Sequence, residues 1–267
     1  MNTFGQTAST TAKVLLNRAT YSFVRTIANP PPEGWLHSRW HWYKAPFSLR
    51  GEVLWSAPLR SWFRAQDESA IECMLHLSDY EPVGWLGVKA GDVFLDVGAY
   101  IGWYAIQAAK TVGALGKVIA IEPDSYNRRQ LEENLALNHV ANCKVIPMAA
   151  WFESAVIGWG SNEVPVWSKI NEASSTESVR AATLDSLASD LGITSLNWIK
   201  MDIEGAEVEA LRGSRRVLRQ FRPALFIEIH DTFEIVRHLL GECGYVIEKS
   251  EFDQPRHQHG WILARCL

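Results

Sequence analysis

From about residue 91 onward, short apolar runs alternate with longer amphipathic stretches. The runs are rich in β-branched and aromatic residues, which favour strands. The stretches between them repeat apolar residues at steps of three and four, as helices do. Strands are predicted at residues 93–96, 117–121, 144–148, 197–201, 225–229, 245–248 and 261–265, and helices at 102–111, 125–138, 184–191, 206–220 and 231–242. This alternation predicts an α/β fold, with a largely parallel sheet and helices on both of its faces.

Two parts of this region depart from the alternation. Only residues 250–260 separate the last two predicted strands, which leaves no room for a crossover helix. These strands are therefore expected to form a hairpin, with one antiparallel strand in the sheet. Residues 151–182 show three short strand-like runs, at 155–159, 164–167 and 178–183, and we interpret them as a β insertion.

The residues before the main domain have a different composition. A chain of 267 residues suits one large domain with an attached segment, so we divide it into residues 1–75 and residues 76–267. The first 50 residues carry six Lys or Arg side chains and a single Glu, and six of the twelve tryptophans precede residue 91. A helix is expected at about residues 9–27. This helix is predicted to pack on the main domain, with a membrane or homodimer contact as alternatives. The aromatic part of the segment is expected to cover the acceptor as a lid.

Composition also excludes several classes of protein. A net charge of −4 argues against a nucleic-acid-binding protein, which would carry a basic domain. No apolar run approaches the roughly 20 residues that a membrane-spanning helix needs. Because the first residues also lack a signal-peptide pattern, we expect no transmembrane segment and a cytoplasmic location. The four cysteines, Cys73, Cys143, Cys243 and Cys266, have no paired spacing and predict neither disulfides nor a zinc site.

The first predicted strand leads into the most informative turn of the chain. Asp96 ends the strand, and Gly98 and Gly102 follow before a helix begins. At the carboxyl edge of a parallel sheet, such a turn lets the backbone approach a ligand closely. The two glycines are four residues apart with Tyr100 between them, which differs from the Gly-x-Gly-x-x-Gly pattern of dinucleotide sites and disfavours NAD. An acid before the glycines suits a ligand with an ammonium group, and Glu122, after the second strand, suits ribose hydroxyls.

Six segments, including this turn, occur in an order seen in a known family. They are Tyr80-Glu81-Pro82, residues 91–99, Ile121-Glu122-Pro123, Thr183-Leu184-Asp185, residues 199–207 and residues 227–230. On these segments the chain resembles the FkbM family of class I S-adenosylmethionine-dependent methyltransferases, over roughly residues 75–250. The resemblance implies a Rossmann-like seven-stranded sheet of order 3-2-1-4-5-7-6, with strand 7 antiparallel.

The resemblance also implies residues that bind S-adenosyl-L-methionine and its product S-adenosyl-L-homocysteine. Asp96, Gly98 and Gly102 would hold the methionine part, Glu122 the ribose, and Met148, Ala149 and Ala150 would border the adenine. Glu81 would approach the cofactor from the segment before the first strand, and Asp202 would lie beside its methionine end. Ala99, Tyr100 and Pro123 are the other residues expected to bind the cofactor. The family usually has Asn where this chain has Tyr100. The tyrosine ring is therefore expected to cover the site.

Acidic residues and a histidine follow the fourth and fifth strands. A hydroxyl acceptor benefits from a group that takes its proton, so Asp202 is the first candidate base, His230 the second and Glu204 a further candidate. Glu207 is interpreted as a helix cap, since acids are favoured at helix N-termini. A metal-assisted alternative would place Mg²⁺ on Asp202, Glu204, Glu228 or His230, but the carboxylates already have these simpler roles and no metal site is assigned.

By resemblance, the predicted activity is methyl transfer to a small-molecule, glycan or peptide acceptor. The favoured reaction is O-methylation of a hydroxyl on a sugar, a glycolipid or a natural product. Two alternatives stay open: N-methylation of an amide or a peptide side chain, and a relative that binds the cofactor without catalysis. The aromatic residues 35–43 and the loop 251–260 are the segments expected to contact the acceptor.

Overall fold

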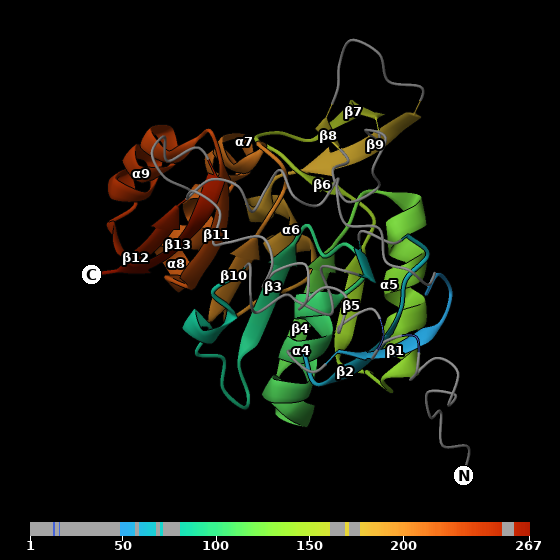
Figure 1. Cartoon of the computed structure of the whole chain (residues 1–267). Helices are drawn as coiled ribbons and strands as arrows, with labels where there is room; N and C mark the ends of the chain where they lie inside the picture. The colour runs from blue at the N-terminus through green and yellow to red at the C-terminus, as the bar shows by residue number, and fades with distance from the viewer. Residues whose placement is uncertain are drawn as a thin grey trace, which may run out of the picture.

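The computed structural model describes residues 13, 16, 49–56, 59–67, 70–71, 81–160, 169–170, 177–252 and 259–267. A seven-stranded sheet forms the centre of the molecule (Figure 1). In spatial order its strands are β12 (Tyr245–Phe252), β13 (His259–Cys266), β11 (Ala224–His230), β10 (Trp198–Met201), β3 (Val93–Val97), β4 (Lys117–Ile121) and β5 (Cys143–Ile146). Neighbouring strands pair in parallel, except that β13 is antiparallel to β11 and β12. This order is the one that the family resemblance implies, and the C-terminal hairpin is the one that the sequence pattern predicts.

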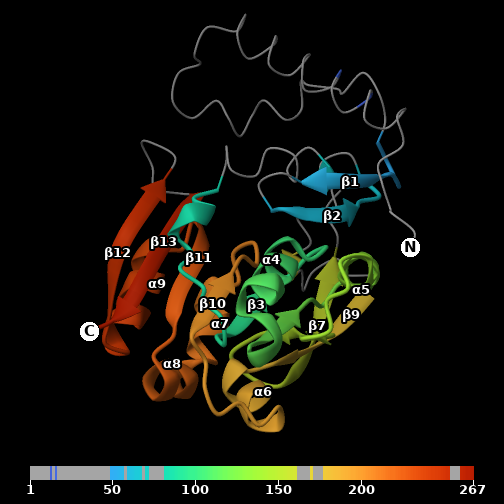
Figure 2. The same ribbon diagram turned by 90° about the horizontal axis from the view of Figure 1, so that it is seen from below.

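Helices cover both faces of the sheet (Figure 2). One face packs against α4 (Trp103–Val112) and α5 (Ser125–Leu137), and the other against α6 (Leu184–Asp190), α7 (Glu207–Arg212), α8 (Arg215–Phe221) and α9 (Phe233–Glu242). Successive side chains of a strand point to opposite faces, so on β3 Phe94 lies in the first core and Leu95 in the second. None of the described helices has the length and apolar character needed to cross a membrane.

The helix predicted over residues 206–220 is divided into α7 and α8. The division occurs at Gly213, where an added Cβ would lie only 2.1 Å from the backbone oxygen of Trp151. The side chain of Asp185, from α6, then accepts hydrogen bonds from the backbone amides of Arg216 (3.0 Å) and Val217 (2.8 Å). These bonds satisfy amides that a new helix start leaves without partners, so the chain begins a second helix instead of continuing the first.

The region after β5 differs from the sequence prediction in its bounds. The strand ends at Ile146 instead of Met148, because the amide of Met148 bonds back to the carbonyl of Ile146 at 3.0 Å and turns the chain. The insertion then forms a separate sheet in the order β6 (Ala149–Ala150), β9 (Glu177–Ala182), β7 (Ala155–Gly160) and β8 (Lys169–Ile170). The strand predicted at residues 164–167 lies outside the described residues.

A hairpin of β1 (Val53–Ser56) and β2 (Ser61–Arg64) packs beside α5, although the sequence pattern does not predict it. Amide side chains of α5 bond to the backbone of β2 and of the residues after it. Asn138 bonds to both backbone groups of Trp62, Asn134 to both of Arg64, and Gln130 accepts from the amide of Gln66. These three side chains are spaced four residues apart and therefore lie on one side of the helix. They bond to backbone groups at the edge of β2 that a neighbouring strand would otherwise pair with.

Most of the predictions for residues 1–75 concern positions without described structure. The helix expected at about residues 9–27 is described only at Lys13 and Leu16, and the aromatic residues 35–43 lie outside the described residues. The loop 251–260 is likewise described only at its ends. Two short 3-10 helices, η2 (Val83–Trp85) and η3 (Gly113–Leu115), complete the described elements that flank β3 and α4.

Candidate functional site

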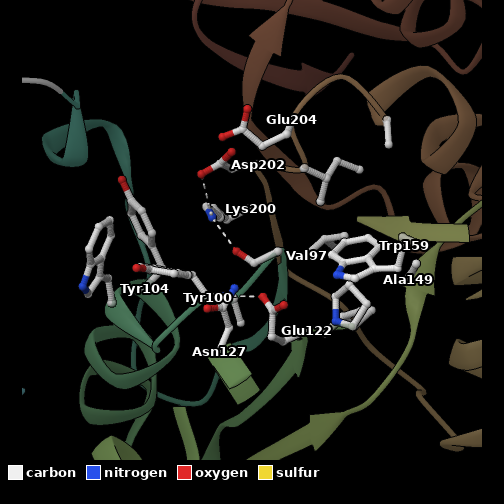
Figure 3. A pocket seen from close by; sticks show the side chains of 18 residues that line it. Val97, Tyr100, Tyr104, Glu122, Asn127, Ala149, Trp159, Lys200, Asp202 and Glu204 are labelled. Carbon is white, nitrogen blue, oxygen red and sulfur yellow. Dashed lines mark hydrogen bonds and ion pairs between the residues drawn. The ribbon is translucent and has the colours of Figure 1, made fainter. Parts of the chain in front are cut away.

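A pocket lies at the carboxyl ends of β3, β4 and β10 (Figure 3). It contains about 840 Å³ of space without atoms, part of it open to solvent. Its lining has three parts: the turn after β3 with two aromatic residues of α4 (Val97, Gly98, Ala99, Tyr100, Trp103 and Tyr104), a mostly apolar side (Ile121, Glu122, Pro123, Asn127, Ala149, Ala150 and Trp159), and a mostly polar end (Lys200, Asp202, Ile203, Glu204 and Ala206).

The turn after β3 needs both of its glycines. Gly98 and Gly102 have φ values of +80° and +98°, in the left-handed region that side chains other than glycine rarely adopt. A Cβ on Gly98 would lie 1.9 Å from the backbone oxygen of Asp202, and a Cβ on Gly102 would lie 2.7 Å from a methyl carbon of Leu131. The glycines therefore bring the turn close to the residues after β10 and to α5.

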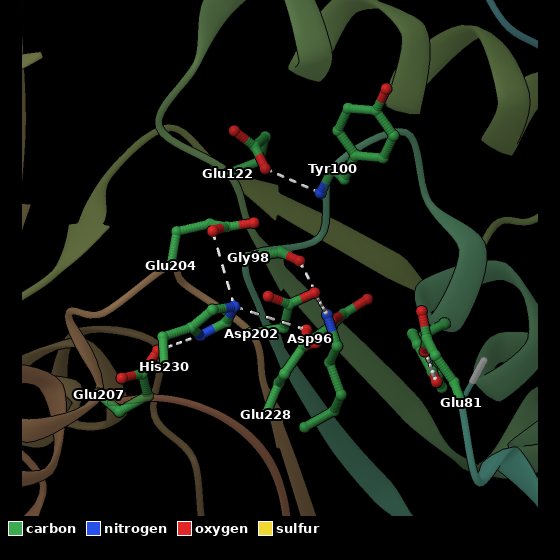
Figure 4. A network of polar contacts seen from close by, with 12 residues as sticks. Glu81, Asp96, Gly98, Tyr100, Glu122, Asp202, Glu204, Glu207, Glu228 and His230 are labelled. Carbon is green, nitrogen blue, oxygen red and sulfur yellow. Dashed lines mark hydrogen bonds and ion pairs between the residues drawn. The ribbon is translucent and has the colours of Figure 1, made fainter. Parts of the chain in front are cut away.

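Tyr100 connects this turn to the N-terminal hairpin. Its φ of +49° is left-handed, a conformation that Asn adopts more easily than an aromatic residue. Its hydroxyl lies 3.0 Å from a carboxylate oxygen of Asp67, and its ring packs edge-on against Trp103. The ring turns away from Asp202 (Figure 4). Tyr100 thus forms a wall of the pocket on the side of the hairpin.

Glu122 is a nearly buried acid on the floor of the pocket. Its carboxylate accepts hydrogen bonds from the backbone amides of Tyr100 (2.7 Å) and Asp124 (2.9 Å). Burial nevertheless raises its pKa to about 8, against the effect of these two amides. Additional hydrogen-bond donors would stabilise the ionised form, so a pair of neighbouring hydroxyls, as on ribose, fits this position.

The apolar side of the pocket includes a residue that the sequence interpretation missed. Trp159, on β7 of the insertion, lies beside Ala149 on β6 (Figure 3). Its indole nitrogen donates to Asp124 at 3.1 Å, and Asp124 also caps the start of α5. The small side chains of Ala149 and Ala150 leave space next to the indole ring. This arrangement fits a flat, apolar group such as a purine.

Lys200 is the second residue that the sequence interpretation did not assign. Its side chain is 4% exposed, and its Nζ donates to the Gly98 carbonyl at 3.0 Å. Asp96 Oδ1 and Asp202 Oδ2 each lie 3.6 Å from this Nζ. Burial opposes the charge of Lys200, but Asp202 and Asp96 outweigh it and raise the pKa to about 12. Lys200 is therefore an ammonium at neutral pH, and Asp96 lies next to it in the interior.

Three further carboxyl groups lie near Lys200, and their pKa values shift in different directions. Burial would raise the pKa of Asp202, but Lys200 and then His230 lower it below its ordinary value. The pKa of Glu228 lies well above its ordinary value, because of burial and then of the charges of Asp202 and Glu81. Burial raises the pKa of Glu81 to about 7, and this residue accepts a hydrogen bond from the hydroxyl of Tyr104. Asp202 is therefore ionised at neutral pH.

His230 is held by a buried acid (Figure 4). Its Nδ1 lies 3.0 Å from Glu207 Oε1, and its Nε2 lies 3.6 Å from Glu204 Oε2. Glu207 is fully buried and also accepts hydrogen bonds from the amide of Gly205 (2.8 Å) and the hydroxyl of Thr232 (2.9 Å). Glu207 is the first residue of α7, and its carboxylate orients the imidazole so that Nε2 faces the carboxylates near the pocket.

The Glu207 contact predicts a pH-dependent stability. Burial lowers the pKa of His230, but the hydrogen bond to Glu207 and the neighbouring carboxylates raise it above its ordinary value of 6.5. The stabilisation from the charged imidazole is thus complete below about pH 6.5 and is lost as the pH rises through the raised pKa. Glu207→Gln is expected to lower the free energy of unfolding by about 2 kcal/mol at about pH 6 and by less at about pH 9. Denaturant unfolding at both pH values measures the difference, and an equal loss would contradict this role.

The structure places the predicted site residues in two groups. Those that line the pocket are Gly98, Ala99, Tyr100, Glu122, Pro123, Ala149, Ala150, Asp202 and Glu204. Those outside its lining are Glu81, Asp96, Gly102, Met148 and His230, with Met148 packed against the second core. Ligand atoms of Asp202, Glu228 and His230 lie within 4.8 Å of one another, so the metal-assisted alternative keeps a geometric basis.

Comparison with known families gives a match that covers most of the sheet. Residues 96–247 match the family model described as the methyltransferase FkbM domain. The chain belongs to the FkbM methyltransferase family. The matched range includes Glu122, Lys200, Asp202 and His230, and the hairpin β1–β2 lies before it. A comparison with curated proteins found no match for the chain.

Solved structures of other methyltransferases are similar to this FkbM family member. The methyltransferase FkbM of Methylobacillus flagellatus KT is 20% identical with a TM-score of 0.51, and the alignment covers 74% of this chain and 55% of that one. The chain thus corresponds to little more than half of that protein. Fibrillarin of Aeropyrum pernix, solved with bound S-adenosyl-L-methionine, is 18% identical (TM-score 0.45; 67% and 68% covered). A SAM-dependent methyltransferase of Aquifex aeolicus is 16% identical (TM-score 0.46; 75% and 99% covered).

Proposed function

We propose that this FkbM family member transfers a methyl group from S-adenosyl-L-methionine to a hydroxyl of a sugar, a glycolipid or a natural product. The supporting observation is that one pocket combines a buried acid, a flat apolar side and a polar end. Glu122 would hold the ribose, Trp159 with Ala149 and Ala150 the adenine, and the turn at Gly98 the methionine part. The cofactor supplies an electrophilic methyl group when it is bound.

The charge state of Asp202 favours an acceptor that must lose a proton. Asp202 is ionised and lies in the lining of the pocket, where it can accept a hydrogen bond from a hydroxyl and orient its oxygen. The hydroxyl becomes much more acidic as its oxygen forms a new bond, so even a carboxylate of low pKa can take its proton. The Nε2 of His230 lies 3.6 Å from the carboxylate of Glu204, and Glu207 holds the imidazole at Nδ1. A charged imidazole in this position stabilises the ionised carboxylates at the polar end of the pocket.

Two measurements test the proposed function. Calorimetry with S-adenosyl-L-homocysteine should show binding, and Glu122→Gln should weaken it by about tenfold, because a carboxylate hydrogen bond to the ribose is lost. Incubation with methyl-labelled cofactor and mixtures of candidate acceptors, followed by mass spectrometry, should place the label on oxygen. Label on nitrogen would favour amide or side-chain methylation instead. Binding without transfer to any acceptor class would indicate a non-catalytic relative.

A further inference from the structure

The proposed reaction does not use the charge of Lys200. Among the described residues that line the pocket, Lys200 alone carries a positive charge. A buried ammonium group is costly unless its surroundings compensate for the lost water.

The contacts of Lys200 are incomplete. It donates one hydrogen bond, to the carbonyl of Gly98 at 3.0 Å, and an ammonium group has three donors. Asp96 and Asp202 lie 3.6 Å from Nζ, whereas charge-assisted hydrogen bonds are about 2.7–2.9 Å long. The ring of Tyr104 lies 5.0 Å from Nζ and contributes a weaker attraction. The contacts of Lys200 with Asp96 and Asp202 are thus long, and an anionic group of a ligand in the pocket can approach Nζ more closely than they do.

The position of Lys200 relates it to the cofactor turn. Lys200 and Asp96 are register partners on β10 and β3, so both side chains lie on the same face directly before the turn. Asp202 follows Lys200 by two residues and lines the same end of the pocket. A cation and an anion are thus presented side by side, which is the arrangement that binds the zwitterionic end of an amino acid.

We propose that Lys200 binds the carboxylate of the amino-acid part of the cofactor, while Asp202 and the carbonyl of Gly98 receive its ammonium group. This inference rests on the proposed function. Asp96 is fully buried and remains beside Lys200 as a counter-ion, so Lys200 keeps its charge when Asp202 engages the ligand. A carboxylate on the acceptor has the same chemistry, and the choice of ligands in the test separates these two sources.

Calorimetry with three ligands tests the role of Lys200. The ligands are S-adenosyl-L-homocysteine, its decarboxylated analogue and adenosine. The wild-type protein is expected to bind S-adenosyl-L-homocysteine at least about tenfold more tightly than the decarboxylated analogue. In Lys200→Met this ratio should fall to about one, while the affinity for adenosine stays within about twofold of wild type, since adenosine has no amino-acid part.

Controls separate binding from folding. Lys117→Met removes an exposed lysine at the start of β4 and should leave all three affinities unchanged. Because Lys200→Met leaves the carboxylate of Asp96 without its cation, the double variant Asp96→Asn/Lys200→Met is measured as well, and thermal melting checks that each variant is folded.

The affinities for the three ligands separate a failure of the inference from a failure of the proposed function. If the wild-type protein binds S-adenosyl-L-homocysteine and its decarboxylated analogue equally tightly, Lys200 does not bind the carboxylate of the cofactor. This result would overturn the inference and leave the proposed function intact, with Lys200 binding an acceptor or stabilising the fold. A ratio that persists in both Lys200 variants, or an adenosine affinity that falls as much as that of S-adenosyl-L-homocysteine, would also overturn it. If the wild-type protein binds none of the three ligands, the proposed function fails, and this inference fails with it. The measured ratios of the wild-type and variant proteins therefore decide between these outcomes.

Discussion

Asp202→Asn is expected to lower turnover by about 10²–10⁴-fold and to weaken the affinity for S-adenosyl-L-homocysteine less, by about tenfold, because Asp202 also contacts the ammonium group of the cofactor in the inference above. Asparagine keeps the shape of the side chain but cannot take a proton from the acceptor. The carboxylate is ionised because Lys200 and His230 stabilise its charge against burial, so the variant loses the proton acceptor that lines the pocket. The measurement is the rate of transfer of labelled methyl to the acceptor found in the screening assay, with calorimetry for affinity.

A control at the same edge of the sheet sharpens this test. Asp231 directly follows β11, is exposed, and does not line the pocket, so Asp231→Asn should retain wild-type turnover. Its φ of +59° is a conformation that Asn tolerates, so the control adds little strain. Wild-type turnover in both Asp202→Asn and His230→Gln would remove these residues from the mechanism. Loss in His230→Gln alone would move the proton acceptor to the imidazole.

Gly98→Ala should abolish cofactor binding and lower the free energy of unfolding by about 2–5 kcal/mol. Two effects add at this position. The left-handed backbone, with φ of +80°, disfavours any Cβ, and the added carbon would lie 1.9 Å from the backbone oxygen of Asp202. The turn and the residues after β10 must move apart to accept it, which displaces the carbonyl that Lys200 contacts.

Gly91→Ala is the matched control for the Gly98 substitution. Gly91 has a φ of +86°, but a Cβ there would meet no atom within 4 Å. It should therefore cost only the conformational strain, about 1–2 kcal/mol, and leave binding of S-adenosyl-L-homocysteine intact. Denaturant unfolding and calorimetry on both variants give the comparison. Equal losses of stability, or retained binding in Gly98→Ala, would show that close approach to Asp202 is not what the turn requires.

Much of the fold was accessible from local patterns. The seven central strands and most helices follow from apolar periodicity, and the strand order that the family resemblance implies agrees with the observed sheet. Errors occurred where distant segments decide the outcome. Asp185 on α6 caps α8 and divides a stretch that is helical throughout by periodicity, and the amides of Asn134 and Asn138 hold a hairpin that has no strong strand signal of its own.

Sequence by itself determined the alternation of strands and helices, the glycine turn after Asp96 and the family, because each depends on residues close together in the chain or on segments in a fixed order. Only the tertiary structure showed that Trp159 of the insertion reaches the pocket and that Glu207 holds His230. The physical reason is that burial and charge pairing depend on side chains from separate strands. Lys200 looks like one polar residue within an apolar strand, and its surroundings become visible only when β3 and β10 pair.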